Sequence, residues 1–267
     1  MSYELSSTLF SDYAEKKRFI KIPAGQSLKA INNGLPEFPD GTILAKTFFY
    51  FNDKRDTTKG KKIIETRVLI KTNNGWSDGT YKWNAEQTDA DLISSGGNES
   101  VQWIDNNGET KSINYQIPSN KQCGNCHNSS GSLTPIGFKI QNLNIGVIRQ
   151  GATINQLTYF HNSSIMDMLN PDSFTSLPDW KNTSFTLEQR ARAYIEVNCA
   201  HCHNDKGYCA NADFHAGYEL SFEQTNISNK KDGILNWMKS GRMPLIGTTV
   251  VHKEGIALME EYIKSLK

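Results

Sequence analysis

A five-residue pattern, Cys-x-x-Cys-His, occurs twice in this chain and constrains its fold more than any other feature. The copies occupy residues 123–127 and 199–203 and use four of the five cysteines. This pattern attaches c-type haem: the thiols add to the porphyrin vinyl groups as thioethers, and the adjacent imidazole ligates the iron. A chain with two copies must fold around two large planar groups. We therefore predict two covalently bound haem c groups, held by Cys123, Cys126 and His127 and by Cys199, Cys202 and His203.

Two other chemistries use paired cysteines. Zinc binds Cys-x-x-Cys pairs in tetrahedral sites, and here 72 residues separate the two pairs, with six histidines as further ligand candidates. The same four thiols can also form two disulfides. Neither chemistry requires a histidine directly after the second cysteine of each pair, and this chain has one both times. Haem is therefore the favoured interpretation, with zinc second and disulfides third.

Charge and hydropathy narrow the range of partners. The 267 residues carry a formal net charge of +1, so we expect neither a nucleic acid nor a membrane surface as partner. No apolar run approaches the roughly 20 residues that span a bilayer, so we expect no transmembrane segment. The fifth cysteine, Cys209, has no thiol left to pair with and is expected to be a small buried side chain.

The haem interpretation also predicts where the protein works. Covalent haem attachment in bacteria takes place outside the cytoplasm. The first 19 residues lack the charged, apolar and small-residue zones of a secretory leader. We therefore expect a periplasmic or otherwise extracytoplasmic protein from which the leader has been removed.

Helical signals dominate the second half of the chain. Thr186 and Gln189 form a capping box, which predicts the start of a helix that runs directly into the second motif. A second, short helix is expected to end at Gly241, just before Met243. The segment 253–267 places apolar side chains on one stripe, which predicts a closing helix. That stripe consists of Ile256, Met259, Ile263 and Leu266.

This order of features resembles class I cytochrome c over about residues 183–267. A helix leads into Cys-x-x-Cys-His, and a loop, a helix with Trp237, a Met-Pro pair and a closing helix follow. The resemblance implies that His203 is the proximal ligand of the second iron and Met243 the distal ligand, with Met238 as the rival. A thioether ligand favours ferrous iron and so raises the reduction potential.

The first half of the chain alternates apolar and polar residues instead. Residues 38–51, 61–72 and 75–83 have the alternation of strands, and residues 100–117 hold two more strands around the hairpin signal Asn106-Asn107-Gly108. We predict a mainly antiparallel sheet that leads directly into the first motif.

This β-rich half is similar to the cytochrome c′-beta family and its lysine-cross-linked relatives that oxidise hydroxylamine. The likeness covers about residues 35–130 and lies in Phe38-Pro-Asp-Gly-Thr42, Lys46, Gly75-Trp76 and the first Cys-x-x-Cys-His. The whole chain also resembles a family of uncharacterised bacterial multi-haem proteins, through the stretches ETRVLI, QTDADL and RARAYIEVNCAHCHN. That second likeness brings no established activity.

The likeness to cytochrome c′-beta implies that His127 is the proximal ligand of the first iron and that the distal side is apolar and open. Phe48 or Phe49 would build the distal wall, and Lys46 would be the cross-linking lysine. A five-coordinate iron of this kind binds NO, CO or hydroxylamine. The residues alone leave a six-coordinate iron equally open. The candidate sixth ligands are His161, Met166, Met168 and His215.

These patterns predict an α+β chain with one haem in each of two modules. Residues 1–150 form the β-rich haem module, residues 151–182 a linker packed across both modules, and residues 183–267 an all-α domain like class I cytochrome c. The expected function is one-electron transfer to a redox partner protein rather than catalysis. The alternative is an enzyme or gas-binding sensor whose first haem keeps an open position for a small nitrogen or oxygen ligand.

Overall fold

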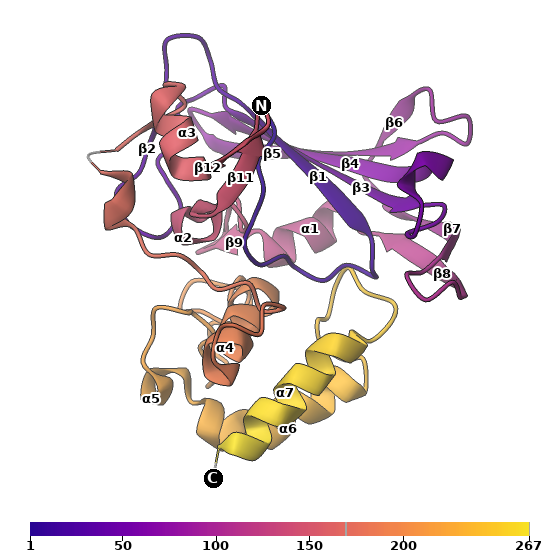
Figure 1. Ribbon diagram of the computed structural model, residues 1–267, viewed down its shortest axis with the longest axis vertical. Coiled ribbons are helices and arrows are strands. Elements are labelled where there is room, and N and C mark those ends of the chain that lie inside the picture. Colours follow the sequence, from indigo (N-terminus) through magenta and orange to yellow (C-terminus); the bar gives the residue numbers. More distant parts are fainter. Residues whose placement is uncertain (169, 267) are drawn as a thin grey trace.

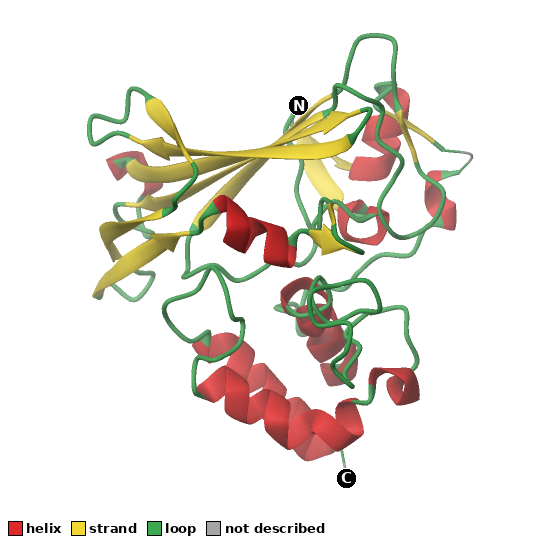
Figure 2. Ribbon diagram, turned by 180° about the vertical axis from the view of Figure 1, so that it is seen from behind, coloured by secondary structure: helices red, strands yellow, loops and turns green. Residues whose placement is uncertain are grey.

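A computed structural model of the chain describes residues 1–168 and 170–266. The longer strands lie in the first part of the chain, and the long helices lie in the last part (Figures 1 and 2). The fold is therefore α+β, with an antiparallel sheet first and helices later. Of the helices described, none is long and apolar enough to cross a membrane.

A five-stranded antiparallel sheet, in the order β1-β3-β4-β5-β6, forms the first part. The three strands predicted between residues 38 and 83 are confirmed, because β-branched and aromatic residues alternate there with charged ones. The sheet strands are β1 (Glu15–Lys21), β3 (Ile43–Phe51), β4 (Lys61–Thr72), β5 (Gly75–Trp83) and β6 (Ala90–Ile93).

A separate hairpin covers one end of the sheet. It consists of β7 (Gly97–Ile104) and β8 (Thr110–Ile117), as the Asn-Asn-Gly signal predicted, and Gly108 adopts the left-handed φ of 84° that the turn requires. The core between hairpin and sheet contains Phe48, Tyr50, Ile64, Trp103 and Tyr115. Because these side chains fill the space between the hairpin and the sheet, this end of the sheet belongs to the core.

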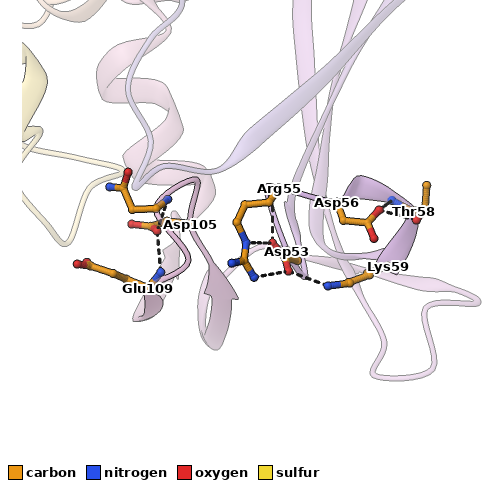
Figure 3. Close-up of polar contacts among 8 residues, drawn as sticks. Asp53, Arg55, Asp56, Thr58, Lys59, Asp105 and Glu109 are labelled. Carbon is orange, nitrogen blue, oxygen red and sulfur yellow. Dashed lines mark hydrogen bonds and ion pairs between the residues drawn. The ribbon is translucent and has the colours of Figure 1, made fainter.

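The loop after β3 is fixed by a buried carboxylate, Asp53. Its oxygens accept hydrogen bonds from the Arg55 guanidinium at 2.9 Å and from the Lys59 ammonium at 3.0 Å, as Figure 3 shows. These cations hold the pKa of Asp53 well below its ordinary value. A β-bridge from Asp53 to Ile104 ties the loop to the covering hairpin.

The short elements lie around the sheet, most of them at the end opposite the covering hairpin (Figure 1). They are β2 (Leu28–Lys29), η1 (Thr57–Lys59, beside Asp53), α1 (Asn120–Cys126), β9 (Asn128–Ser129), β10 (Ser132–Leu133), α2 (Ile140–Leu143), β11 (Gly146–Arg149), β12 (Ala152–Asn155), α3 (Gln156–Asn162), β13 (Met166–Asp167) and η2 (Pro171–Ser173). β11 and β12 pair with each other, so the predicted boundary at residue 150 falls inside one hairpin. Residues 151–182 do contribute to two cores: Leu157 and Phe160 pack with the sheet side, whereas Leu177 and Trp180 pack with the helices.

The helical part contains α4 (Leu187–Asn198), α5 (Phe222–Thr225), α6 (Ile227–Lys239) and α7 (Lys253–Ser265). The capping box of Thr186 and Gln189 at the start of α4 is confirmed. The buried stripe of α7 differs in part from the prediction, because Leu258 and Tyr262 are buried beside Met259 and Ile263. Ile256 and Leu266 are only partly buried.

The N-terminal segment, residues 7–13, joins the two parts. The backbone amide of Phe10 donates to the side-chain oxygen of Asn198 at 2.9 Å, and the Ser7 hydroxyl donates to the carbonyl of Pro178 at 2.8 Å. The loop before α7 reaches this segment from the other side (Figure 1). Whether residues 183–267 fold on their own stays a prediction, and these contacts argue that they depend on residues 7–13.

Candidate functional site

The first motif lies on α1, directly after the covering hairpin. Ser119 caps the helix in a capping box with Gln122, and the helix ends at Cys126. The backbone amide of His127 donates to the carbonyl of Cys123 at 2.9 Å, so the last turn carries both thiols and the imidazole. Cys123 is buried, and Cys126 and His127 are half-buried.

The imidazole of His127 is oriented for a ligand on its outer nitrogen. Its Nδ1 lies 2.9 Å from the carbonyl oxygen of Thr134, which can accept a hydrogen bond from Nδ1–H. Nε2 is then the deprotonated nitrogen. A hydrogen bond from Nδ1 to a backbone carbonyl, which fixes the orientation of the ring, is typical of metal-ligating histidines. Burial lowers the pKa of His127 to about 4, so the ring is neutral at pH 7, as metal binding requires.

The second motif follows the C-terminus of α4. The amide of His203 donates to the carbonyl of Cys199 at 2.9 Å, as in the first motif. Burial lowers the pKa of His203 too, and its ring lies 5.0 Å from that of Phe214. Among the described residues, the buried Nδ1 of His203 has no hydrogen-bond partner.

The two motifs meet through their second cysteines. The ligand atoms of Cys126, His201 and Cys202 all lie within 4.8 Å of one another. Hydrogen bonds from Cys202 and from His201 hold the pKa of Cys126 down at about 5, and the contact between the thiols raises the pKa of Cys202. Cys126 is therefore the more nucleophilic of this pair of thiols near neutral pH.

A cavity of about 440 Å³ opens beside the first motif, between the sheet and the helical part. Its volume lies within the roughly 300–1,000 Å³ that is usual for cofactor sites. One wall is the face of the sheet that carries Arg18, Lys46 and Arg67. The opposite wall comes from the segment 133–139 and from α4. Cys123 and His127 line this cavity.

A second cavity, of about 480 Å³, lies inside the helical part. Cys199, Cys202 and His203 line it from one side. α6 and the loop after it supply the other side, with mostly apolar side chains. These include Ile234, Trp237, Met238, Met243, Leu245 and Ile246. The second cavity is therefore a helix-lined, largely apolar chamber with thioether sulfurs in its wall.

The two cavities adjoin. Four residues line both of them: Cys126, His201, Pro244 and Ile246. Groups bound in the two cavities would thus meet near Cys126 and Cys202, with no intervening layer of protein core.

The predicted distal ligand of the second site, Met243, is one of the residues that line the second cavity. Met243 is half-buried and lines the same cavity as His203. Met238 also lines this cavity and belongs to the helical core, so it is still the rival ligand. The predicted sulfur ligand is therefore one of two that α6 and its following loop supply.

The candidate sixth ligands of the first iron lie elsewhere. His161 is exposed at the end of α3, and Met166 and Met168 are buried in the core on the sheet side. His215 pairs with Asp205 at 3.0 Å. Within the described part of the chain, none of the four lines the first cavity.

Two expectations about the first site need correction. Phe48 packs in the core beneath the covering hairpin and Phe49 packs against Phe51, and neither lines the first cavity. The pairing of β3 with β4 shifts register between these two residues, and Phe48 is buried in the core with the residues of the hairpin. Lys46, in contrast, does line the cavity with His127.

Cys209 also differs from its expectation. Its side chain is half-buried rather than buried, and it lines the second cavity. The backbone amide of Cys209 donates to the carbonyl of Cys202 at 2.9 Å, which holds the fifth thiol near the second motif. Partial burial raises the pKa of Cys209, so the thiol is protonated near neutral pH.

Sequence analysis missed two groups of residues. Arg18 and Arg67 line the first cavity. The alternation of the strand could have predicted this for Arg18, because it places Arg18 on the same buried face as Ile20. Asp12 accepts hydrogen bonds from the amides of Thr249 and Val250 in the loop that carries Met243. No local pattern links residues so far apart in the sequence.

Comparisons with protein-family models, with curated proteins and with solved structures return no match to this chain. The function must therefore be inferred from the residues of the chain and their geometry.

Proposed function

We propose that this protein is a dihaem c-type cytochrome that transfers single electrons. The observation that carries the proposal is that each Cys-x-x-Cys-His motif faces its own cavity and that the two cavities adjoin. Sulfur and imidazole donors lie beside volumes suited to a cofactor, and the carbonyl-bound Nδ1 of His127 leaves Nε2 of that ring for iron.

The residues of the chain would hold and tune the two groups. Haem, when bound, supplies an iron that changes its charge by one electron. The Thr134 carbonyl would fix the ring plane of His127, and α1 and the end of α4 would hold the paired thiols in register with each imidazole. The apolar wall of the second cavity excludes water, and together with a Met243 thioether it would raise the potential of that site.

The shared lining of the cavities supports transfer between the two groups. Cys126 and Cys202 would each carry a thioether to a different macrocycle, and their sulfurs lie within 4.8 Å of each other. With haem attached at both motifs, Cys126 and Cys202 would hold the two groups close together, which favours electron transfer between them. As part of the same proposal, the protein works outside the cytoplasm and exchanges electrons with a redox partner protein.

The test is the covalent cofactor content of the full-length chain after export through a haem-maturation system. Its intact mass should exceed that of the polypeptide by two haem units. The pair Cys123→Ser with Cys126→Ser should leave one haem, and Cys199→Ser with Cys202→Ser should leave the other. Cys209→Ser is the matched control and should keep both.

Zinc is the competing occupant because Cys126, His201 and Cys202 already bring three ligand atoms together. Structural zinc sites have four protein ligands. An unmodified mass, or one zinc per chain from the same preparation, would contradict the haem proposal.

A second function is favoured by one observation. None of the four candidate sixth ligands lines the first cavity within the described residues, whereas two methionines line the second. A first iron bound to His127 would then keep an open coordination position. The protein would in that case bind a small nitrogen or oxygen ligand at the first haem and use the second to supply or remove electrons.

A further inference from the structure

Three cationic side chains stand side by side across the sheet and face the first cavity. Arg18 on β1 is the direct register partner of Lys46 on β3, and Lys46 is the register partner of Arg67 on β4. Thr80 on β5 continues the line opposite Arg67. All four line the cavity that contains His127. We call Arg18, Lys46, Arg67 and Thr80 the cationic row.

Such a row is unfavourable unless something compensates it. Like charges directly opposite each other on neighbouring strands destabilise a sheet. Arg18 is only 9% exposed, and its burial together with that of Lys46 lowers the pKa of both side chains. The cationic row therefore places positive charge close together in a poorly hydrated wall.

The chain supplies too few anionic side chains to neutralise the positive charge of the cationic row. Arg67 is paired with Glu65, which also accepts a hydrogen bond from Tyr115 at 2.7 Å. Among the described residues, neither Arg18 nor Lys46 has a side-chain hydrogen bond or ion pair, and Lys46 lies over the ring of Phe48. Asp78 lines the same cavity but lies opposite Leu69, two register positions away from the row.

We propose that the cationic row is a binding site for a carboxylate or another oxyanion group inside the first cavity. Charged donors bind oxyanions with the strongest hydrogen bonds available to side chains, and Thr80 adds a hydroxyl donor. The neighbouring register row, Leu44 and Leu69, gives the same wall an apolar strip for a flat ring.

Two sources can supply that oxyanion. One is the pair of carboxylates on the haem attached at His127, and this form of the inference rests on the proposed function. The other is a free inorganic or organic oxyanion that enters the cavity, which requires no haem. The two sources predict different responses to added anion, so one set of variants separates them.

The experiment uses the full-length, haem-loaded protein and titrates it with inorganic phosphate against chloride at constant ionic strength. The variants are Lys46→Met and Arg18→Gln. The matched control is Lys17→Met, because Lys17 is exposed on β1 and points to the other face of the sheet, opposite Thr47. Thermal unfolding and the midpoint potentials of both haems are measured for each.

A free oxyanion would give a saturable, phosphate-dependent rise in the unfolding temperature. Its affinity should fall at least about tenfold in Lys46→Met and in Arg18→Gln and stay unchanged in Lys17→Met. Haem carboxylates would instead leave the wild type insensitive to phosphate. In that case the potential of the first haem should fall in both variants, because a cation next to a ferric haem disfavours its oxidised form.

The proposal is overturned if Lys46→Met and Arg18→Gln match Lys17→Met in phosphate response and in both potentials. Peptide mapping that finds Lys46 bonded covalently to haem would also overturn it, since a cross-linked lysine is no longer a free cation. The haem content of the same preparation tests the proposed function separately. If the chain from that preparation carries no haem, the cytochrome proposal is contradicted. Phosphate binding through the cationic row of that same chain would still support the oxyanion site.

Discussion

The two Cys-x-x-Cys-His motifs share one backbone hydrogen bond, from the histidine amide to the carbonyl of the first cysteine, yet they face different surroundings. The first opens toward a sheet whose inner face carries charge, and its cavity includes Arg18, Lys46, Arg67 and Asp78. The second opens toward helices, and the charged residues in the wall of its cavity are Asp213 and Lys230, with two methionines among the apolar side chains. The same five-residue motif thus lines two cavities whose walls differ in chemistry.

The motif and the elements that surround it therefore have separate roles. The motif sets the attachment points and the imidazole, since both copies hold His to the carbonyl of the first Cys by the same backbone hydrogen bond. The surrounding elements decide whether a sixth ligand is within reach and how much charge the cofactor meets. The predictions below test that division, from the largest effect to the smallest.

The largest effect should be a difference in gas binding between the two haems. If the proposed haems are bound, the reduced protein should bind one CO per chain, because two methionines line the second cavity and, among the described residues, none of the four candidate ligands lines the first. Optical titration of the fully reduced protein with CO gives the stoichiometry. The variant Cys123→Ser with Cys126→Ser, which lacks the first haem, should bind none. If neither haem of the wild type binds CO, the open first site is wrong and simple electron transfer is the better account.

The next effect is that of removing the methionine ligand. Met243→Ala should lose the weak Met–Fe charge-transfer band of the oxidised protein, and the potential of the second haem should fall by roughly 0.1–0.3 V, within the ~0.8 V range that axial ligands set. The variant should also bind a second CO. Met238→Leu is the matched comparison and should change neither. The opposite pattern would make Met238 the ligand.

The dependence of the second site on the first part of the chain should be smaller but measurable. Asp12 is 1% exposed, and its carboxylate accepts hydrogen bonds from the amide and hydroxyl of Thr249 at 2.8 and 2.9 Å. Asp12→Ala should lower the free energy of unfolding by about 2–3 kcal/mol, because it removes several hydrogen bonds to one charged acceptor. It should also weaken the Met–Fe band, since the freed loop carries Met243.

Denaturant unfolding and the spectrum of the oxidised protein measure both effects. The control is Asp91→Ala, a change at an exposed aspartate on β6. A loss of stability with a full Met–Fe band would mean that the loop keeps Met243 in position without Asp12.

Local signals in the sequence were sufficient for most of the architecture. Alternation predicted β3, β4 and β5, and the capping box of Thr186 predicted α4, because both depend on neighbours within a few residues. The five-residue motifs predicted where the donors cluster for the same reason. The position of Met243 followed from the order of elements in a resembling family rather than from its own neighbours.

Long-range packing determines the features that local sequence patterns did not predict. Phe48 was expected at the distal wall, but the β7–β8 hairpin buries it, and only the register of β1, β3 and β4 places Arg18, Lys46 and Arg67 in one line. The contact between Cys126 and Cys202 joins motifs that are 76 residues apart in the chain. No periodicity in one strand or helix contains that information.

The last effect is a pH dependence of the contact between the two parts, which is absent at neutral pH and involves His252. Its ring stacks on Phe10 at 4.1 Å, its Nδ1 lies 3.0 Å from the Tyr194 hydroxyl, and burial lowers its pKa to about 4. The unfolded chain protonates His252 near pH 6.5, so the native state binds fewer protons between pH 6.5 and 4. The stability that neutral His252 contributes is therefore fully present above pH 6.5 and is lost as the pH falls toward 4, by up to about 3 kcal/mol. Urea unfolding of His252→Gln across this range should show a flatter profile than the wild type, whereas His161→Gln, at an exposed position on α3, should follow the wild type. Parallel profiles for all three proteins would show that protonation of His252 does not weaken the contact between residues 7–13 and the loop that carries Met243.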